Sequence, residues 1–99
     1  RDIIGFMEVI DDNISVREFS SGAEIIKGYD ACKTVYDALF EASPNLHSKV
    51  LTRTVFGNKV IDHEYITGRN GSKQPIELVL IYEVNDEKIT EITVLREQE

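Results

Sequence analysis

The segment that is most informative about the fold extends from Leu46 to Gly68 and reads LHSKVLTRTVFGNKVIDHEYITG. It contains two β-forming runs separated by the dipeptide Gly57-Asn58. A two-residue connection of this kind predicts a tight β-hairpin, because glycine readily adopts the positive φ angle that such a turn needs. With these two residues as the loop, Arg53 is predicted to lie directly opposite Asp62.

Side chains alternate along a strand, so the predicted register divides the hairpin into two faces. Both faces are partly apolar, which predicts that both are covered. The first face mixes aliphatic residues with three charges, and this pattern indicates the wall of a pocket. That face carries Leu51, Arg53, Val55, Val60, Asp62, Glu64 and Ile66. The other face carries Val50, Thr52, Thr54, Phe56, Ile61, His63 and Tyr65.

Length and charge limit the classes of protein that this chain can belong to. Its 99 residues make one small domain. A chain of this size buries only roughly 60–65% of its unfolded surface, which favours association into a homodimer. The formal net charge of −7, without a basic cluster, argues against a nucleic-acid partner. No apolar run approaches the roughly 20 residues of a transmembrane helix and no signal peptide is evident, so we expect no membrane partner and a cytoplasmic location.

The remaining segments predict helices first and long antiparallel strands afterwards, which is typical of an α+β fold. Helical spacing of apolar residues predicts a short helix within residues 1–10, stopped by the turn formers Asp11-Asp12-Asn13. A second helix is predicted over Tyr29–Ala42, because an apolar stripe runs along it and Pro44 follows. The stripe consists of Cys32, Val35, Tyr36, Leu39 and Phe40. The other predicted strands cover residues 14–19, 23–26, 75–84 and 88–97.

Four stretches together resemble the NTF2-like superfamily, in particular its steroid-isomerase-like and SnoaL-like members. The resemblance implies a single domain over residues 1–99 in which a curved antiparallel sheet wraps around helices to form a cone. The interior of such a cone holds a small apolar molecule, and the family commonly pairs through its sheets. The family's first helix has no counterpart before Arg1, so we expect that helix to be missing here. The stretches are RDIIGFMEVIDDNISV (1–16), IKGYDACKTVYDALF (26–40), SPNLHSKVLTRTVFGNKVIDHEYITG (43–68) and YEVNDEKITEI (82–92).

The same resemblance implies where the site lies. It makes the face with Asp62 and Glu64 the concave one, with Leu78, Leu80 and Tyr82 beside it. Ketosteroid isomerases keep a carboxylate base on the first strand, and the residue of this chain most similar in position is Glu18. Their oxyanion-hole acid would fall near Leu80, and leucine cannot donate that hydrogen bond.

The two carboxylates of the hairpin are expected to differ in chemistry. Arg53 should lower the pKa of Asp62, whereas Glu64 faces Leu51 in the predicted register and has no matched cation. Desolvation in a dry pocket should raise the pKa of Glu64, which would suit a general acid or base near neutral pH. The alternative is that Arg53 and Asp62 form a structural cross-strand pair and that Glu64 reaches water.

Tyrosine hydroxyls supply the second candidate chemistry. Tyr82 and Tyr36 could each donate a hydrogen bond to a ligand carbonyl, or could instead be core rings. A metal site is not expected, because Cys32 is the only cysteine and the two histidines stand on separate segments without acidic residues at ligand spacing. No cofactor is expected either.

Two functions remain open after these considerations. The first is cofactor-independent proton transfer next to a carbonyl, as in an isomerase or cyclase, with Glu64 or Glu18 moving the proton and Tyr82 stabilising the oxyanion. The second is a non-catalytic ligand-binding or dimerisation module. The predicted ligand-binding residues are Tyr36, Phe40, Arg53, Asp62, Leu78 and Leu80. The predicted homodimer surface is the outer sheet face with Ile61, His63, Tyr65, Val79 and Ile81.

Overall fold

The computed structural model describes residues 3–97, and their side chains from Gly5 onward. Helices and a single curved sheet make up this part of the chain, which confirms the predicted α+β class. The hairpin around Gly57-Asn58 and the long second helix lie where the sequence places them. The elements are α1 (Ile3–Glu8), β1 (Ile10–Glu18), β2 (Glu24–Lys27), α2 (Tyr29–Ala42), β3 (His47–Phe56), β4 (Lys59–Thr67), the short 3-10 helix η1 (Arg69–Gly71), β5 (Ile76–Asn85) and β6 (Lys88–Arg96).

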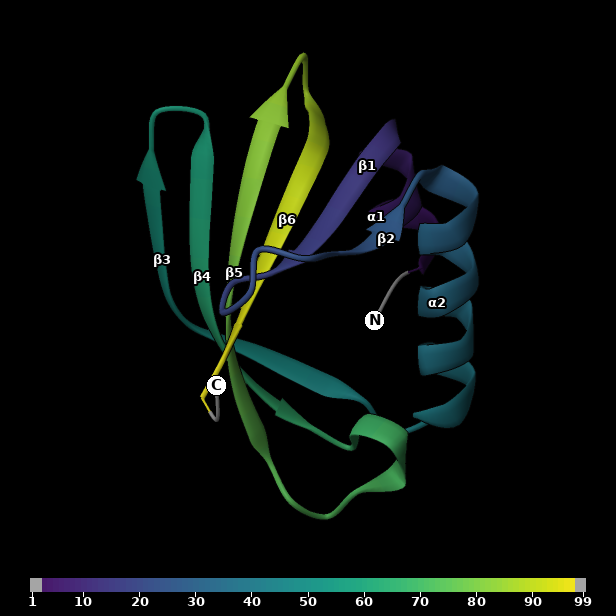
Figure 1. Cartoon of the computed structure of the whole chain (residues 1–99). Helices are drawn as coiled ribbons and strands as arrows, with labels where there is room; N and C mark the ends of the chain where they lie inside the picture. The colour runs from purple at the N-terminus through teal and green to yellow at the C-terminus, as the bar shows by residue number, and fades with distance from the viewer. Residues whose placement is uncertain (1–2, 98–99) are drawn as a thin grey trace.

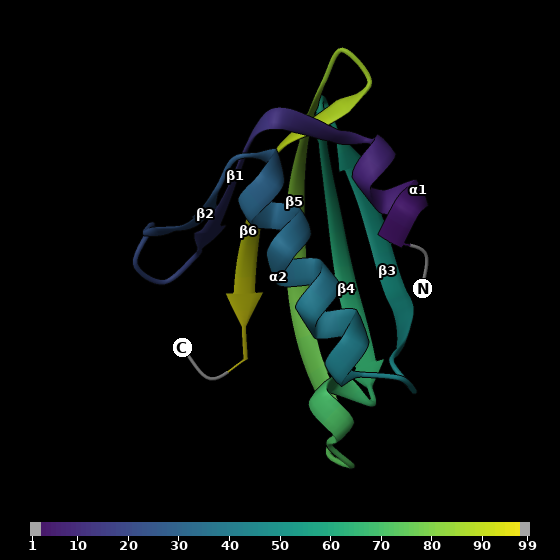
Figure 2. The ribbon, with the colours of Figure 1, turned by 90° about the vertical axis from the view of Figure 1, so that its right-hand side faces the viewer.

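The sheet has the strand order β2-β1-β6-β5-β4-β3. Neighbouring strands are antiparallel, except that β1 runs parallel to β6. The sheet curves, and α2 stands on its concave side (Figure 1). Figure 2 shows α2 lying across β4, β5 and β6 when the molecule is turned by 90°. The concave side of the sheet therefore faces a helix that can close a cavity.

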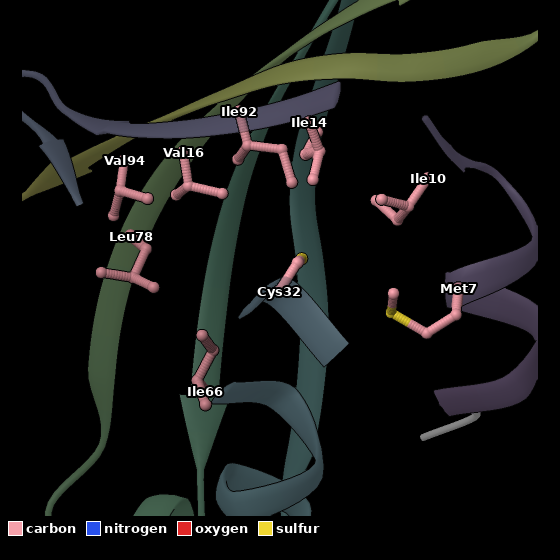
Figure 3. Close-up of a cluster of buried hydrophobic side chains, with 9 residues drawn as sticks. All are labelled: Met7, Ile10, Ile14, Val16, Cys32, Ile66, Leu78, Ile92 and Val94. Atoms are coloured by element: carbon pink, nitrogen blue, oxygen red, sulfur yellow. The ribbon is translucent and has the colours of Figure 1, made fainter. Parts of the chain in front are cut away.

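The hydrophobic core lies between the first half of α2 and the strands. Cys32 is fully buried at its centre, as the position of Cys32 on the apolar stripe predicts. Figure 3 shows side chains from α1 and from several strands converging around it. The core residues are Met7, Ile10, Ile14, Val16, Cys32, Ile66, Leu78, Ile92 and Val94. Because these contacts lie at one end of α2, the other half of the helix is left to line the cavity.

The start of β1 differs from its prediction. Asp11-Asp12-Asn13 does not form the predicted turn between helix and strand, since these residues lie inside a strand that begins at Ile10. The local turn chemistry is present, because the Asn13 N–H donates to the Asp11 carboxylate at 2.9 Å. The β6 pairs lie on either side of these three residues, Ile10 with Ile89 and Ser15 with Glu91, and the ladder is irregular between them. Burial of Ile10 and Ile14 nevertheless keeps the segment in the strand, so tertiary packing overrides the local preference.

The predicted hairpin register is correct near the turn and wrong further from it. Arg53 pairs with Asp62 as predicted, but the register shifts between Val50 and Thr52. Glu64 consequently lies opposite Val50 rather than Leu51, so Val50 shares the face of Glu64 and not the outer face. The cause is a β-bulge, which adds one residue to one strand and cannot be read from alternation alone.

The outer face of the sheet carries the residues from which a homodimer surface is predicted, in β4 and β5. Ile61 pairs with Ile81 and His63 with Val79, so their side chains share the face away from α2. Tyr65 lies on the same face and is exposed. Association of two copies through this surface stays a prediction. Among residues 3–97, no helix is long and apolar enough to cross a membrane.

Candidate active site

A cavity of about 430 Å³ lies between α2 and the concave face of the sheet. Its volume falls within the range of roughly 300–1,000 Å³ that is usual for small-molecule sites. Most of its wall is aliphatic or aromatic. The predicted residues Tyr36, Phe40, Glu64, Leu78, Leu80 and Tyr82 all line it.

The helix side of the cavity is fixed by local sequence. An ion pair between Lys33 and Asp37 at 2.7 Å supports the exposed face of α2, and the helix ends just before Pro44. On the opposite face, the ring of Tyr36 packs against Phe6 with centroids 4.8 Å apart and against Phe40 at 6.3 Å. These tilted contacts hold the tyrosine ring in one place. The hydroxyl of Tyr36 is thereby held in the wall of the cavity.

Among the described residues that line this cavity, Glu64 is the one with an acidic side chain, and only 9% of it is exposed. The Ser48 hydroxyl donates a hydrogen bond to its carboxylate at 3.0 Å. Within residues 3–97, no cation forms an ion pair with it. Burial raises the pKa of Glu64 above its ordinary value, and the nearby charge of Asp62 adds to that effect, while Ser48 and Arg53 oppose it. The prediction of a glutamate pKa raised by desolvation is therefore confirmed.

Two tyrosine hydroxyls accompany this carboxyl group. Burial raises the pKa of Tyr36 to about 12 and also raises the pKa of Tyr82, and the charge of Glu64 contributes to both increases. Both phenols are therefore protonated at neutral pH and can act as hydrogen-bond donors. No group in the described part of the chain hydrogen-bonds either hydroxyl. In the part of the chain that the structure describes, the cavity wall thus brings two tyrosine hydroxyls without a protein partner together with one carboxyl group.

Arg53 and Asp62 lie beside this site rather than in it. They line a second cavity of about 340 Å³, which shares Phe6, Glu64 and Tyr82 with the first. The arginine donates two hydrogen bonds to the aspartate, from Nε to Oδ1 at 2.7 Å and from Nη2 to Oδ2 at 2.8 Å. Asp62 is 2% exposed, so this arrangement is the structural cross-strand pair that the sequence left open as an alternative.

Glu18, the other candidate base, is not brought into either cavity. Its carboxylate accepts hydrogen bonds from Arg96, at 3.0 Å from Nη2 and 3.2 Å from Nε. Arg96, by contrast, does line the larger cavity. The structure therefore leaves Glu64 as the carboxyl group in position to reach a bound ligand.

Sequence reasoning missed three polar lining residues, namely Ser48, Arg69 and Arg96. Ser48 could not be predicted, because only the bulge places it on the same face as Glu64. Arg69 follows Gly68, and the polar loop they belong to gave no signal except its glycines. Among residues 3–97, no group of three or more His, Cys, Asp and Glu side chains converges as a set of metal ligands.

Comparison with solved structures gives the fold. The chain aligns with an uncharacterized cystatin-fold protein of Novosphingobium aromaticivorans at a TM-score of 0.84 and 19% identity, over 96% of this chain and 85% of that one. An NTF2-like protein of unknown function from Mesorhizobium loti aligns at 0.78 and 18% identity, over 97% and 78%. A proposed polyketide cyclase of Sinorhizobium meliloti aligns at 0.76 and 22% identity, over 94% and 81%. At these identities the similarity shows the fold alone, which is that of the NTF2-like superfamily.

The family is given by the sequence itself. Residues 1–92 match the family model of the SnoaL-like domain, so the chain belongs to the SnoaL-like family. Among curated proteins, none matches the chain. Family membership confirms the resemblance in the sequence and does not specify a ligand or a reaction.

Proposed function

We propose that this protein binds a small apolar ketone in the larger cavity and transfers a proton at the carbon next to the carbonyl, as an isomerase or cyclase would. One observation carries the proposal. The carboxyl group of Glu64 is buried in an apolar cavity beside two tyrosine hydroxyls that have no partner among the described residues. Hydroxyl groups in a cavity wall that no described side chain occupies can donate to the carbonyl of a ligand.

The proposed chemistry uses only protein side chains. Glu64 in its carboxylate form removes a proton from the carbon next to the carbonyl. The electrons of the broken C–H bond form a C=C bond, and the negative charge moves to the carbonyl oxygen. Tyr82 and Tyr36 donate hydrogen bonds to that oxygen, where the charge develops. In an isomerisation, Glu64 then returns the proton to another carbon and the carbonyl re-forms. In a cyclisation, the enolate carbon attacks a second carbonyl, the C=O π electrons move to that oxygen, and Glu64 returns the proton to the resulting alkoxide.

The pKa directions support these roles. A raised pKa makes Glu64 a stronger base than an exposed glutamate, and brings its titration closer to the pH at which proton transfer is efficient. Raised tyrosine pKa values keep both phenols protonated, so they stabilise the oxyanion as donors. The three groups therefore have complementary protonation states.

The proposal is tested with β-tetralone, an aromatic ketone whose acidic hydrogens exchange in deuterium oxide. NMR should show that the protein accelerates the exchange and that Glu64→Gln lowers the rate by at least about 100-fold, which is the usual size of a general-base contribution. Glu41→Gln, on the exposed side of α2, removes the same charge and should leave the rate unchanged. The contrary result is a Glu64→Gln protein that still binds the ketone and exchanges it at the original rate. That result would favour the non-catalytic binding module.

A further inference from the structure

From the part of the chain that the structure describes, the larger cavity is lined by the cationic side chains of Arg69 and Arg96 and by the carboxyl group of Glu64. Arg96 is held by Glu18. The guanidinium group of Arg69, in contrast, has no ion-pair or hydrogen-bond partner within residues 3–97. It is half-buried, and its charge lowers the pKa of Tyr36, which opposes the larger effect of burial. An unpaired cation therefore lies within electrostatic reach of the ligand-facing hydroxyl.

The backbone around Arg69 is fixed by contacts that do not involve its charge. Gly68 has a φ angle of 78°, and a side chain there would collide with the backbone carbonyl of Asn45. The next turn is held because the Asn70 N–H donates to the hydroxyl of the buried Ser43 at 2.7 Å. Figures 1 and 2 both show η1 next to the C-terminal end of α2. The loop thus holds the arginine backbone in a defined place at one end of the cavity.

The negative charge of the whole chain makes an unneutralised arginine in the cavity an indication of an anionic group on the ligand. The protein has a formal net charge of −7, which repels anions in general. A site for an anion therefore needs a local cation that is not already neutralised. Arginine suits a carboxylate particularly well, because its planar fork can donate two parallel hydrogen bonds. A neutral apolar ligand would gain nothing from this side chain and would leave it partly desolvated.

We propose that the ligand of this cavity is an apolar ketone that carries a carboxylate, and that Arg69 binds that carboxylate. The ketone part of this statement rests on the proposed function, whereas the carboxylate part rests on the geometry of Arg69. The apolar body would fill the space between α2 and the sheet. Its carboxylate would lie at the η1 end, apart from the carbonyl next to Glu64 and Tyr82.

The test compares a biphenyl γ-keto acid with its methyl ester, which differ in charge and little in shape. Calorimetry should show that the wild-type protein binds the acid about tenfold more tightly than the ester, the size expected for hydrogen bonds to a charged group. Arg69→Gln should remove this preference by weakening the acid about tenfold while leaving the ester unchanged. Lys73→Gln, an exposed residue four positions along the chain, removes the same charge outside the cavity and should keep the preference.

Two results would overturn the inference. One is equal affinity of the wild-type protein for acid and ester. The other is an Arg69→Gln protein that is folded by circular dichroism and retains the preference for the acid, which would assign the arginine to the C-terminal dipole of α2. Hydrogen exchange on the same two compounds separates this outcome from the proposed function. If binding depends on Arg69 but no hydrogen exchange occurs, the proposed proton transfer is refuted and the carboxylate site is not. If exchange occurs but does not depend on Arg69, the carboxylate site is refuted and the proposed proton transfer is not.

Discussion

The β3–β4 hairpin has two halves in which similar carboxylates have different partners: a turn-side half that contains Asp62 and a base-side half, beyond the bulge, that contains Glu64. Toward the turn, Asp62 is held by a two-fold hydrogen-bonded pair with Arg53. Two residues further along the same face, beyond the bulge, Glu64 meets only the hydroxyl of Ser48. A carboxylate paired with a cation is satisfied, whereas a buried one with a single neutral donor is left reactive. The partner that β3 supplies, rather than the acidic residue itself, therefore decides whether a carboxyl group of β4 is held in a structural pair or is available for proton transfer.

The bulge between Val50 and Thr52 is what sets this difference. In a regular ladder, Ser48 would not share the face of Glu64, and the glutamate would lie opposite Leu51. The extra residue instead puts Val50 opposite Glu64 and brings the Ser48 hydroxyl to its carboxylate. Bulges next to active sites commonly redirect side chains in this way.

The largest expected effect is on catalysis and concerns the hydroxyl groups that accompany Glu64. We expect Tyr82→Phe to lower the rate of ketone exchange about 100-fold, because one donor to the developing oxyanion is lost. Stability should change little, since the hydroxyl has no partner in residues 3–97 to lose. Asp62→Asn, in the turn-side half, should leave the exchange rate within about threefold, apart from its effect on folding. A rate that falls equally in both variants would contradict the division of the hairpin into two halves.

The next effect is on stability and belongs to the turn-side half. Arg53→Met should lower the free energy of unfolding, because it leaves the buried carboxylate of Asp62 without its cation. The loss should be smaller than for a fully buried pair, since the arginine side chain is 58% exposed. Asp62→Asn should lower the free energy of unfolding less, because the charged residue left without its partner is then the exposed Arg53. Urea unfolding of the two variants measures the difference, and a larger loss for Asp62→Asn would contradict this assignment.

Much of the fold follows from local sequence, and part of the site does not. Gly57-Asn58 fixes the turn, and the apolar stripe with Pro44 fixes α2, because each depends on neighbours in the chain. The pairing of Arg53 with Asp62 follows from the turn for the same reason. Ser48 and Arg69 could not be found in this way. The first depends on an inserted residue in the ladder, and the second depends on a loop held against Asn45 and Ser43, which are distant in sequence.

The smallest effect concerns the pH dependence of stability and tests the base-side half directly. Because the pKa of Glu64 is raised in the folded state above its ordinary value of 4.5, the folded protein binds the proton more tightly than the unfolded chain does. The glutamate therefore favours folding most at pH values below 4.5. This contribution is lost as the pH rises through the raised pKa. Each unit of increase in that pKa corresponds to about 1.4 kcal/mol.

The glutamine of Glu64→Gln cannot titrate. The free energy of unfolding of this variant should therefore rise relative to that of the wild-type protein as the pH increases above 4.5. The difference should become constant once the pH exceeds the raised pKa of Glu64. Chemical unfolding of both proteins at a series of pH values measures the difference. Glu41→Gln on the exposed side of α2 serves as the control for loss of one negative charge. A Gln variant that instead loses stability relative to the wild-type protein as the pH rises would mean that the folded protein favours the carboxylate of Glu64. Glu64 would then be stabilised in its charged form, as a carboxylate paired with a cation is, and the two halves of the hairpin would not differ in this respect.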